Sequence, residues 1–208
     1  MRHSRHISLS IIISAVVLLF VGCTRSNHCT SIDVEALEQR LEQGDLVFRR
    51  GTGVVGRIVT SVDTRGQFSH VGVAVIKDGV WHIIHAVPHE PDFEGDVDRV
   101  KCEPLASFVG RYESGAVGIY RVNISEEGRE IAIHNAWRLS RENRAFDHEY
   151  DTDDTTKLYC TELVEHIYKL AGVSLSGGRR TRLSFPTLSG EYIMPSDMTD
   201  SELLTLIY

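Results

Sequence analysis

The sequence of 208 residues lacks any run of lysine or arginine, and its formal net charge is −7. It therefore has no electrostatic footprint for nucleic acid. Low-complexity tracts and internal repeats are also missing, and the glycines lack the spacing of a phosphate-binding loop. The composition is that of an ordinary globular protein, long enough for one domain with a real core. We expect neither a nucleic-acid partner nor a cofactor.

The longest apolar run, from Ile7 to Val21, is shorter than the roughly 20 residues of a membrane-spanning helix. Arg2 and Arg5 precede this run, and small residues follow it. Basic, apolar and small residues in this order are typical of a secretory signal. The sequence thus predicts an exported protein.

The end of the run, Phe20-Val21-Gly22-Cys23, resembles the lipobox of bacterial lipoproteins, although leucine is usual at the position of Phe20. The resemblance implies a signal peptide over residues 1–22 and lipidation of Cys23 as the mature N-terminus. Plain secretion and an uncleaved anchor are the alternatives. Because Thr24 rather than aspartate follows the cysteine, the implied location is the bacterial cell envelope, in a Gram-negative cell the outer membrane facing the periplasm.

Residues 23–32 are then expected to form a tether and residues 33–208 the folded domain. Three cysteines remain besides Cys23, namely Cys29, Cys102 and Cys160. Export permits disulfides, and a bond between Cys29 and Cys102 is the pairing that spares Cys160. The sequence leaves open whether that bond forms.

Cys160 falls in the first turn of a predicted helix. Apolar residues recur at helical spacing from Leu163 to Ala171, and Gly172 stands where the helix would stop. A thiol at this position is close to the free N–H groups of a helix N-terminus, which favour thiolate. We therefore expect a depressed pKa at Cys160, although a cysteine taken alone is more often a small core residue.

A β-hairpin is predicted upstream, with a turn around Asp78-Gly79. A four-residue loop, which we favour, would place His70 directly opposite His85 with Cβ atoms about 4.5–5.5 Å apart. A two-residue turn would make His85 a diagonal neighbour on the same face. Only a slip of one residue would bring His82 there instead. The two strands are His70–Val75 and Val80–Val87.

Further elements follow from periodicity and from turn residues. A final short helix is expected to open at Ile193-Met194-Pro195-Ser196-Asp197 and to end in Leu203, Leu204 and Ile207. The other predicted elements are helices over 33–43, 54–59 and 126–139, a strand over 116–122, and a strand and short helix within 98–108.

A cysteine nucleophile needs a base that takes its proton and a third group that orients the base. Cys160, His70 and His85 could supply all three. The competing chemistry is a metal site formed by His82, His85 and His89. Residues three apart on a strand point to opposite faces, and Pro88 breaks the strand before His89, so we expect no metal site.

Five segments carry a resemblance to the YiiX/YebB-like branch of the NlpC-type cysteine hydrolases. This branch is circularly permuted relative to papain, so that the histidine precedes the cysteine, an order that also resembles lecithin:retinol acyltransferase. The resemblance implies an α+β, permuted papain-like fold in which an antiparallel sheet packs against the helix that carries the nucleophile. The segments are 44–48, 68–73, 84–87, 159–164 and 194–198.

The resemblance also implies roles for individual residues: Cys160 as nucleophile, His70 as general base and His85 as the third residue. Many permuted relatives carry glutamate in place of His85, and a carboxylate would be the stronger orienting group. Tyr159, beside the nucleophile, is a candidate for the oxyanion site or a packing aromatic.

The implied function is that of an exported, lipid-anchored cysteine hydrolase that cleaves an amide bond, in a cell-wall peptide or a related amide, through an acyl-enzyme. An acyl-lipid hydrolase or acyltransferase is the alternative enzyme, with an amide or ester substrate near the membrane. A non-catalytic envelope lipoprotein that uses the fold as a binding module is the alternative without chemistry. The sequence does not distinguish the scissile bond or the oligomeric state.

Overall fold

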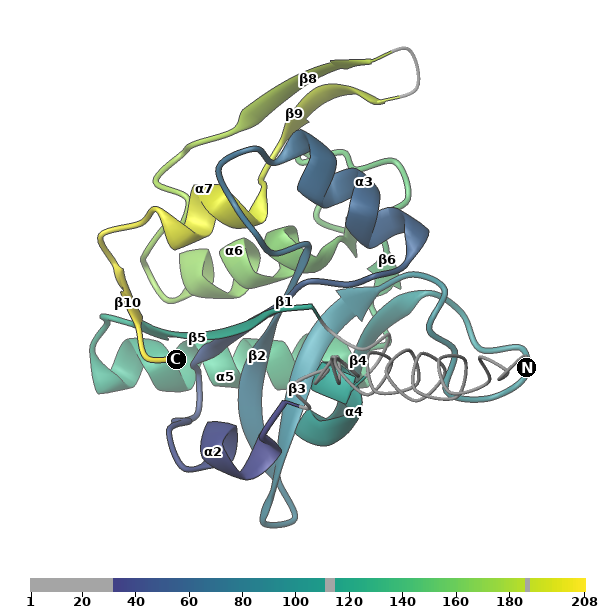
Figure 1. Ribbon diagram of the computed structural model, residues 1–208. Helices are drawn as coiled ribbons and strands as arrows, with labels where there is room; N and C mark the ends of the chain where they lie inside the picture. Colours follow the sequence, from purple (N-terminus) through teal and green to yellow (C-terminus); the bar gives the residue numbers. More distant parts are fainter. Residues whose placement is uncertain (1–31, 111–114, 186–187) are drawn as a thin grey trace, which may run out of the picture. The chain divides into compact units, whose positions relative to one another are not determined.

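An eight-stranded sheet forms the centre of the fold, with the strand order β10-β5-β1-β2-β3-β4-β6-β7 (Figure 1). The computed structural model describes residues 32–110, 115–185 and 188–208. Neighbouring strands are antiparallel, except that β6 and β7 run parallel. The strands are β1 (Leu46–Arg49), β2 (His70–Lys77), β3 (Val80–Val87), β4 (Arg99–Pro104), β5 (Val117–Val122), β6 (Ala145–Phe146), β7 (Lys157–Leu158) and β10 (Leu204–Leu206).

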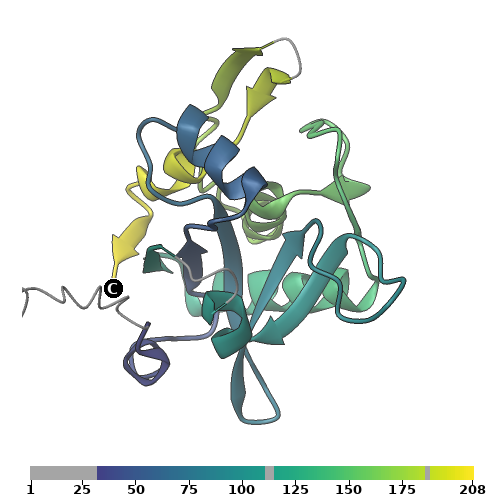
Figure 2. The ribbon, with the colours of Figure 1, turned by 45° about the vertical axis from the view of Figure 1, so that its right-hand side comes forward.

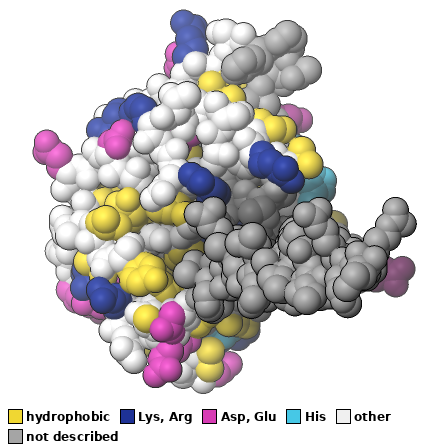
Figure 3. Space-filling model, in the orientation of Figure 1, with side chains coloured by type: hydrophobic (Ala, Val, Ile, Leu, Met, Phe, Trp, Pro, Cys, Tyr) yellow, Lys and Arg dark blue, Asp and Glu magenta, His cyan; other side chains and the backbone are white. Residues whose placement is uncertain are grey.

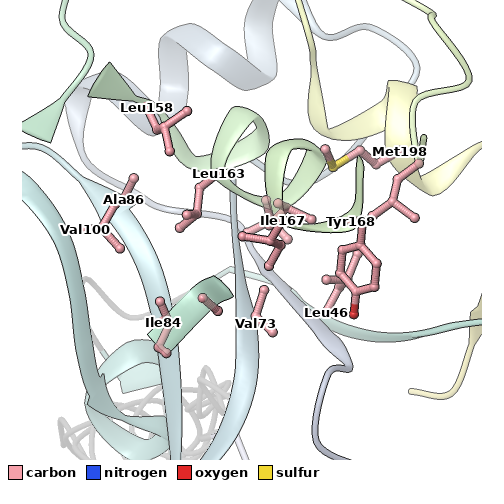
Figure 4. Close-up of a cluster of buried hydrophobic side chains, with 14 of the residues drawn as sticks. Leu46, Val73, Ile84, Ala86, Val100, Leu158, Leu163, Ile167, Tyr168 and Met198 are labelled. Atoms are coloured by element: carbon pink, nitrogen blue, oxygen red, sulfur yellow. The ribbon is translucent and has the colours of Figure 1, made fainter. Parts of the chain in front are cut away.

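Helices cover both faces of the sheet. On one face, α5 and α6 bury the larger apolar cluster, in which Leu163 and Ile167 of α6 lie against Val73 of β2 (Figure 4). On the other face, α2 and α4 bury a second cluster that includes Phe108. The helices are α2 (Val34–Glu38), α3 (Val54–Val62), α4 (Leu105–Gly110), α5 (Glu126–Arg141), α6 (Cys160–Leu170) and α7 (Pro195–Thr199). The predicted α+β class, with an antiparallel sheet against the cysteine helix, is confirmed.

The helix α6 begins at Cys160, as its sequence predicts. The Glu162 carboxylate accepts a hydrogen bond from the backbone N–H of Tyr159, at 3.3 Å, and so caps the first turn. The helix ends before Gly172, whose φ of +89° is the left-handed conformation that glycine favours. The thiol is therefore fixed at the N-terminus of a helix whose apolar face packs in the core.

The hairpin between β2 and β3 has a two-residue turn, and the favoured four-residue loop is wrong. Lys77 pairs with Val80, and the turn residues Asp78 and Gly79 have φ of +51° and +78°. Positive φ at both central positions is typical of a type I′ turn, which matches the twist of the flanking strands. The register moves by two residues, so His85 is the diagonal neighbour of His70 and stays on its face.

The chain end differs from the sequence-based prediction. The last helix, α7, ends at Thr199, and the segment expected to continue it forms β10, which pairs with β5. The residues expected to end this helix, Leu203, Leu204 and Ile207, therefore lie in or beside the edge strand of the sheet. A second hairpin, β8 (Thr181–Phe185) with β9 (Leu188–Tyr192), was not predicted and extends beyond α7 and α3 (Figure 2).

The expected signal peptide, the lipidation site Cys23 and residue Cys29 all lie outside the described residues. Within the described part of the chain, no helix is both long and apolar enough to cross a membrane. Among the described residues, Cys102 forms no disulfide, and its predicted pairing with Cys29 stays a prediction.

Candidate active site

Two histidines lie side by side on the sheet face that α4 covers. His70 begins β2, His85 lies on β3, and they are 8% and 0% exposed. Gly72 allows this approach, since a Cβ placed there would lie 3.0 Å from the Cβ of His85 and 2.9 Å from the carbonyl oxygen of Ile84. His82 pairs with Val75 and belongs to the opposite face. The sheet thus groups His70 with His85 and leaves out His82.

The two imidazoles are in direct contact. His70 Nε2 lies 2.8 Å from His85 Nδ1. On the far side of the pair, His85 Nε2 lies 2.9 Å from Oε1 of Glu103, which is on β4 and 4% exposed. The Phe108 ring of α4 packs on both imidazoles, with centroid distances of 5.7 and 5.1 Å. The result is a chain of polar groups that runs across three strands and is shielded from water.

Cys160 and His70 line the same cavity, whose volume is about 170 Å³. Residues from distant parts of the chain form its wall, which is almost entirely apolar or aromatic. The helix α3 contributes Val55, Ile58, Val59 and Val62. Phe146, Tyr150, Tyr159 and Tyr192 form the aromatic part. The apolar side chains of α3 also reach the surface, where Val54, Val55 and Ile58 are 73%, 43% and 45% exposed (Figure 3).

Burial raises the pKa of the Cys160 thiol to about 11, despite the nearby backbone N–H groups of Val71 and Thr161 and of Cys160 itself. The expected depressed pKa is therefore wrong. Helix-terminal N–H groups do favour thiolate, but the loss of hydration outweighs them. Burial also holds the pKa of His70 well below 6.5, and the pKa of His85 is lowered for the same reason. Burial therefore favours the neutral forms of the thiol and of both imidazoles.

Tyr159 is buried and precedes Cys160 in the chain. Its hydroxyl accepts a hydrogen bond from the backbone N–H of Ile193, at 2.9 Å, and the hydroxyl of Thr161, two residues later, donates to the Ile193 carbonyl, at 2.6 Å. These two contacts attach the start of α6 to the segment before α7. The oxyanion role of Tyr159 stays a prediction, and its packing role is visible in these contacts.

A comparison with protein families decides where this chain belongs. The family described as "Permuted papain-like amidase enzyme, YaeF/YiiX, C92 family" matches residues 40–208. The chain belongs to this family. The predicted resemblance to the permuted, YiiX-like branch is thereby confirmed, and the chain is a cysteine hydrolase of the amidase type. The likeness to lecithin:retinol acyltransferase stays a prediction.

A solved structure agrees with this membership. The crystal structure titled metalloprotein yiiX from Escherichia coli O157:H7 is similar in fold, with a TM-score of 0.66 at 20% sequence identity. The similarity covers 81% of this chain and 97% of that one. A search of curated proteins found no match.

Two of the segments that carry the predicted resemblance have structural roles. Asp45, 1% exposed, accepts two hydrogen bonds from Arg121, at 3.0 and 2.9 Å. Asp197 caps the start of α7 by accepting from the backbone N–H of Met194, at 2.8 Å, and pairs with Arg65. These aspartates hold the scaffold around the site and do not reach the thiol's cavity.

Three acidic or imidazole side chains could be considered for a metal ion: His85, Glu90 and Glu103, whose ligand atoms lie within 4.8 Å of one another. Cationic side chains of the protein already lie against both carboxylates of this cluster. Arg49 Nη2 lies 2.6 Å from Glu90 Oε1, and Lys101 Nζ lies 3.9 Å from Glu103 Oε2. Because a guanidinium and an ammonium balance these carboxylates, the cluster fits a divalent cation poorly. His89, from the metal alternative in the sequence, is exposed and not part of the cluster.

Sequence reasoning missed Glu103 and the buried cations beside it. The signal was the alternation of Arg99, Lys101 and Glu103, which places three charged side chains on one face of a strand. Charges repeated on one face indicate a solvated surface in most proteins. Here Lys101 and Glu103 are only 2% and 4% exposed, so the face is a buried polar network instead.

Proposed function

We propose that this protein is an exported, lipid-anchored amidase in which Cys160, His70 and His85 form the catalytic triad. His70 Nε2 is engaged by His85, so Nδ1 is the nitrogen left for the thiol. The thiol proton passes to His70 Nδ1 as the sulfur attacks the amide carbonyl. The same proton then leaves with the amine, and water releases the acyl group from Cys160. This is general-base catalysis from a neutral pair rather than attack by a preformed thiolate.

The apolar wall of the cavity is the observation that carries the substrate class. Cell-wall peptides present carboxylates and amines, which would lose hydration in such a cavity without gaining partners. An apolar acyl group gains free energy on entering, by about 25 cal/mol per Å² of buried area. We therefore propose an amide with an apolar acyl group as the substrate, ahead of a cell-wall peptide. An acyl-lipid ester is the second candidate, supported by the same wall.

Ile58→Asn is expected to lower kcat/KM for long apolar acyl esters by about tenfold, since a polar amide would replace part of the acyl-binding wall. Acetyl esters, which do not reach the wall, should be hydrolysed at nearly the wild-type rate. The measurement is the kcat/KM of p-nitrophenyl esters from acetyl to decanoyl. Val80→Asn is the matched control, because Val80 is also 51% exposed but lies at the hairpin turn. Equal losses for all chain lengths would contradict the acyl-binding role.

Cys23→Ser is expected to release the protein from membranes, because it removes the proposed lipidation site. Fractionation of cells that express either form measures the change, and the mass of the wild-type N-terminus gives an independent check. The serine variant should appear in the soluble envelope fraction or stay attached through an uncleaved signal. A wild-type N-terminus whose mass includes no lipid would refute the anchor.

A further inference from the structure

The Glu103 carboxylate has no part in the triad described above, yet it ends the polar chain that begins at His70 and passes through His85. Its Oε1 atom is 2.9 Å from His85 Nε2, and both residues are buried. His85 and Glu103 lie diagonally across β3 and β4, where His85 pairs with Lys101. The backbone of the sheet thus sets this contact.

The contact decides which nitrogen of each imidazole carries the proton. An ionised carboxylate only accepts hydrogen bonds, so its approach to 2.9 Å favours a proton on His85 Nε2. A neutral His85 then has a lone pair on Nδ1, which accepts from His70 Nε2–H. His70 in turn is left with a lone pair on Nδ1, the form that can take a proton from the thiol. The opposite tautomers would leave His70 Nδ1 protonated and useless as a base.

We propose that Glu103 is a positioning residue that fixes the tautomers of His85 and His70, and so makes His70 a base toward Cys160. The inference rests on the proposed function, because it assumes the roles of His70 and His85 given there. A second effect follows when the thiol proton reaches His70. The imidazolium that forms donates through Nε2 to His85, and the negative charge of Glu103 stabilises the ring pair without taking the proton itself.

Other charged groups face the two imidazoles and set the sign of this effect. Arg49, opposite His70 in the β1–β2 register, and Lys101 disfavour a positive charge on His70. Glu90 and Glu103 favour one on His85, whereas Arg49 disfavours it there too. Without the negative charge of Glu103, the positive charges of Arg49 and Lys101 are less balanced. The pKa of His70 therefore falls, and its protonation requires a lower pH.

The test has a readout that does not depend on activity. Two-bond ¹⁵N–¹H spectra of histidine-labelled wild-type protein at pH 7 should show His70 and His85 protonated at Nε2 and not at Nδ1. In Glu103→Gln the amide can donate or accept at His85 Nε2, so the Nδ1-protonated form should appear. Nδ1-protonated His85 in the wild type would overturn the proposal.

The pH dependence of the acylation rate provides a second test of the role of Glu103. Glu103→Gln is expected to lower the plateau of acylation kcat/KM by about 10- to 100-fold and to shift the acid limb downward by about 1 pH unit. Glu90→Gln removes a carboxylate of the same buried cluster whose Oε1 atom is paired with Arg49, and should leave the imidazole tautomers unchanged. Rates are corrected for the active fraction by titration of the thiol.

The outcomes separate the two proposals. If wild-type protein forms no acyl-enzyme at Cys160, the proposed function fails, whereas the tautomer spectra still test Glu103. If the wild type is acylated but Glu103→Gln keeps its tautomers and its acid limb, the role of Glu103 is refuted alone. Both glutamine variants could instead show a lower pH-independent kcat/KM with no shift of the acid side of the pH profile. Glu103 would then have only a structural role, and the proposal would also be refuted.

Discussion

His85→Ala is expected to slow the acylation of Cys160 by roughly 100- to 10 000-fold, whereas His82→Ala should leave it close to the wild-type rate. His85 Nδ1 is 2.8 Å from the base, and its loss frees His70 to rotate and to adopt the wrong tautomer. His82 points to the other face of the sheet and contacts the carbonyl of Val80 instead. The measurement is single-turnover acylation by an activated ester.

Folding is the necessary control, since His85 is completely buried and alanine leaves a cavity. His85→Leu fills more of that volume without restoring a polar atom, and should be as slow as His85→Ala. Circular dichroism and thermal melting compare all three variants with the wild type. A folded His85→Leu protein with full activity would remove His85 from the triad.

Glutamate at position 85 illustrates how the structure changes an expectation. The sequence alone suggests that His85→Glu retains or improves activity, because a carboxylate is the stronger orienting group. In the structure that carboxylate would be buried beside Glu103, and like charges at short range disfavour ionisation. We therefore expect His85→Glu to be slower than the wild type.

His70→Gln is expected to slow acylation by about 10⁴-fold at pH 7, because a thiol whose pKa is about 11 is then only about 1 part in 10⁴ thiolate. Without a base, the reaction depends on this small fraction. The rate of the variant should rise tenfold for each pH unit up to about pH 10. Acylation rates measured from pH 5 to 10 test the slope.

The wild-type profile should look different in the same pH range. His70 accepts a proton only well below pH 6.5, since burial lowers its pKa, so the base stays available at pH 6. The rate should be nearly flat from about pH 6 to 9 and fall only in more acidic solution. Cys102→Ser serves as the background in all variants, so that no thiol at position 102 contributes. A pH-independent rate in His70→Gln would mean that Cys160 is a thiolate at rest, contrary to the general-base mechanism.

The sequence by itself determined the local elements on which the site depends. The apolar spacing from Leu163 to Ala171 and the stop at Gly172 located α6, with Cys160 in its first turn. Side chains alternate between the two faces of a strand, which placed His70 and His85 on one face and His82 on the other. A register shift of two residues does not change this grouping. These properties depend on neighbours within a few residues, so a local pattern is enough to predict them.

The tertiary structure decided the rest. The turn geometry at Asp78-Gly79 set the diagonal contact between the histidines, and the pairing of β3 with β4 brought Glu103 to His85. The cavity wall combines α3 with aromatic residues from three distant segments, which no local pattern links. Burial by these segments also reversed the expected pKa shift of Cys160. Hydration and long-range pairing depend on the whole folded chain, and for that reason the sequence located Cys160 and the proposed base His70 but not their protonation.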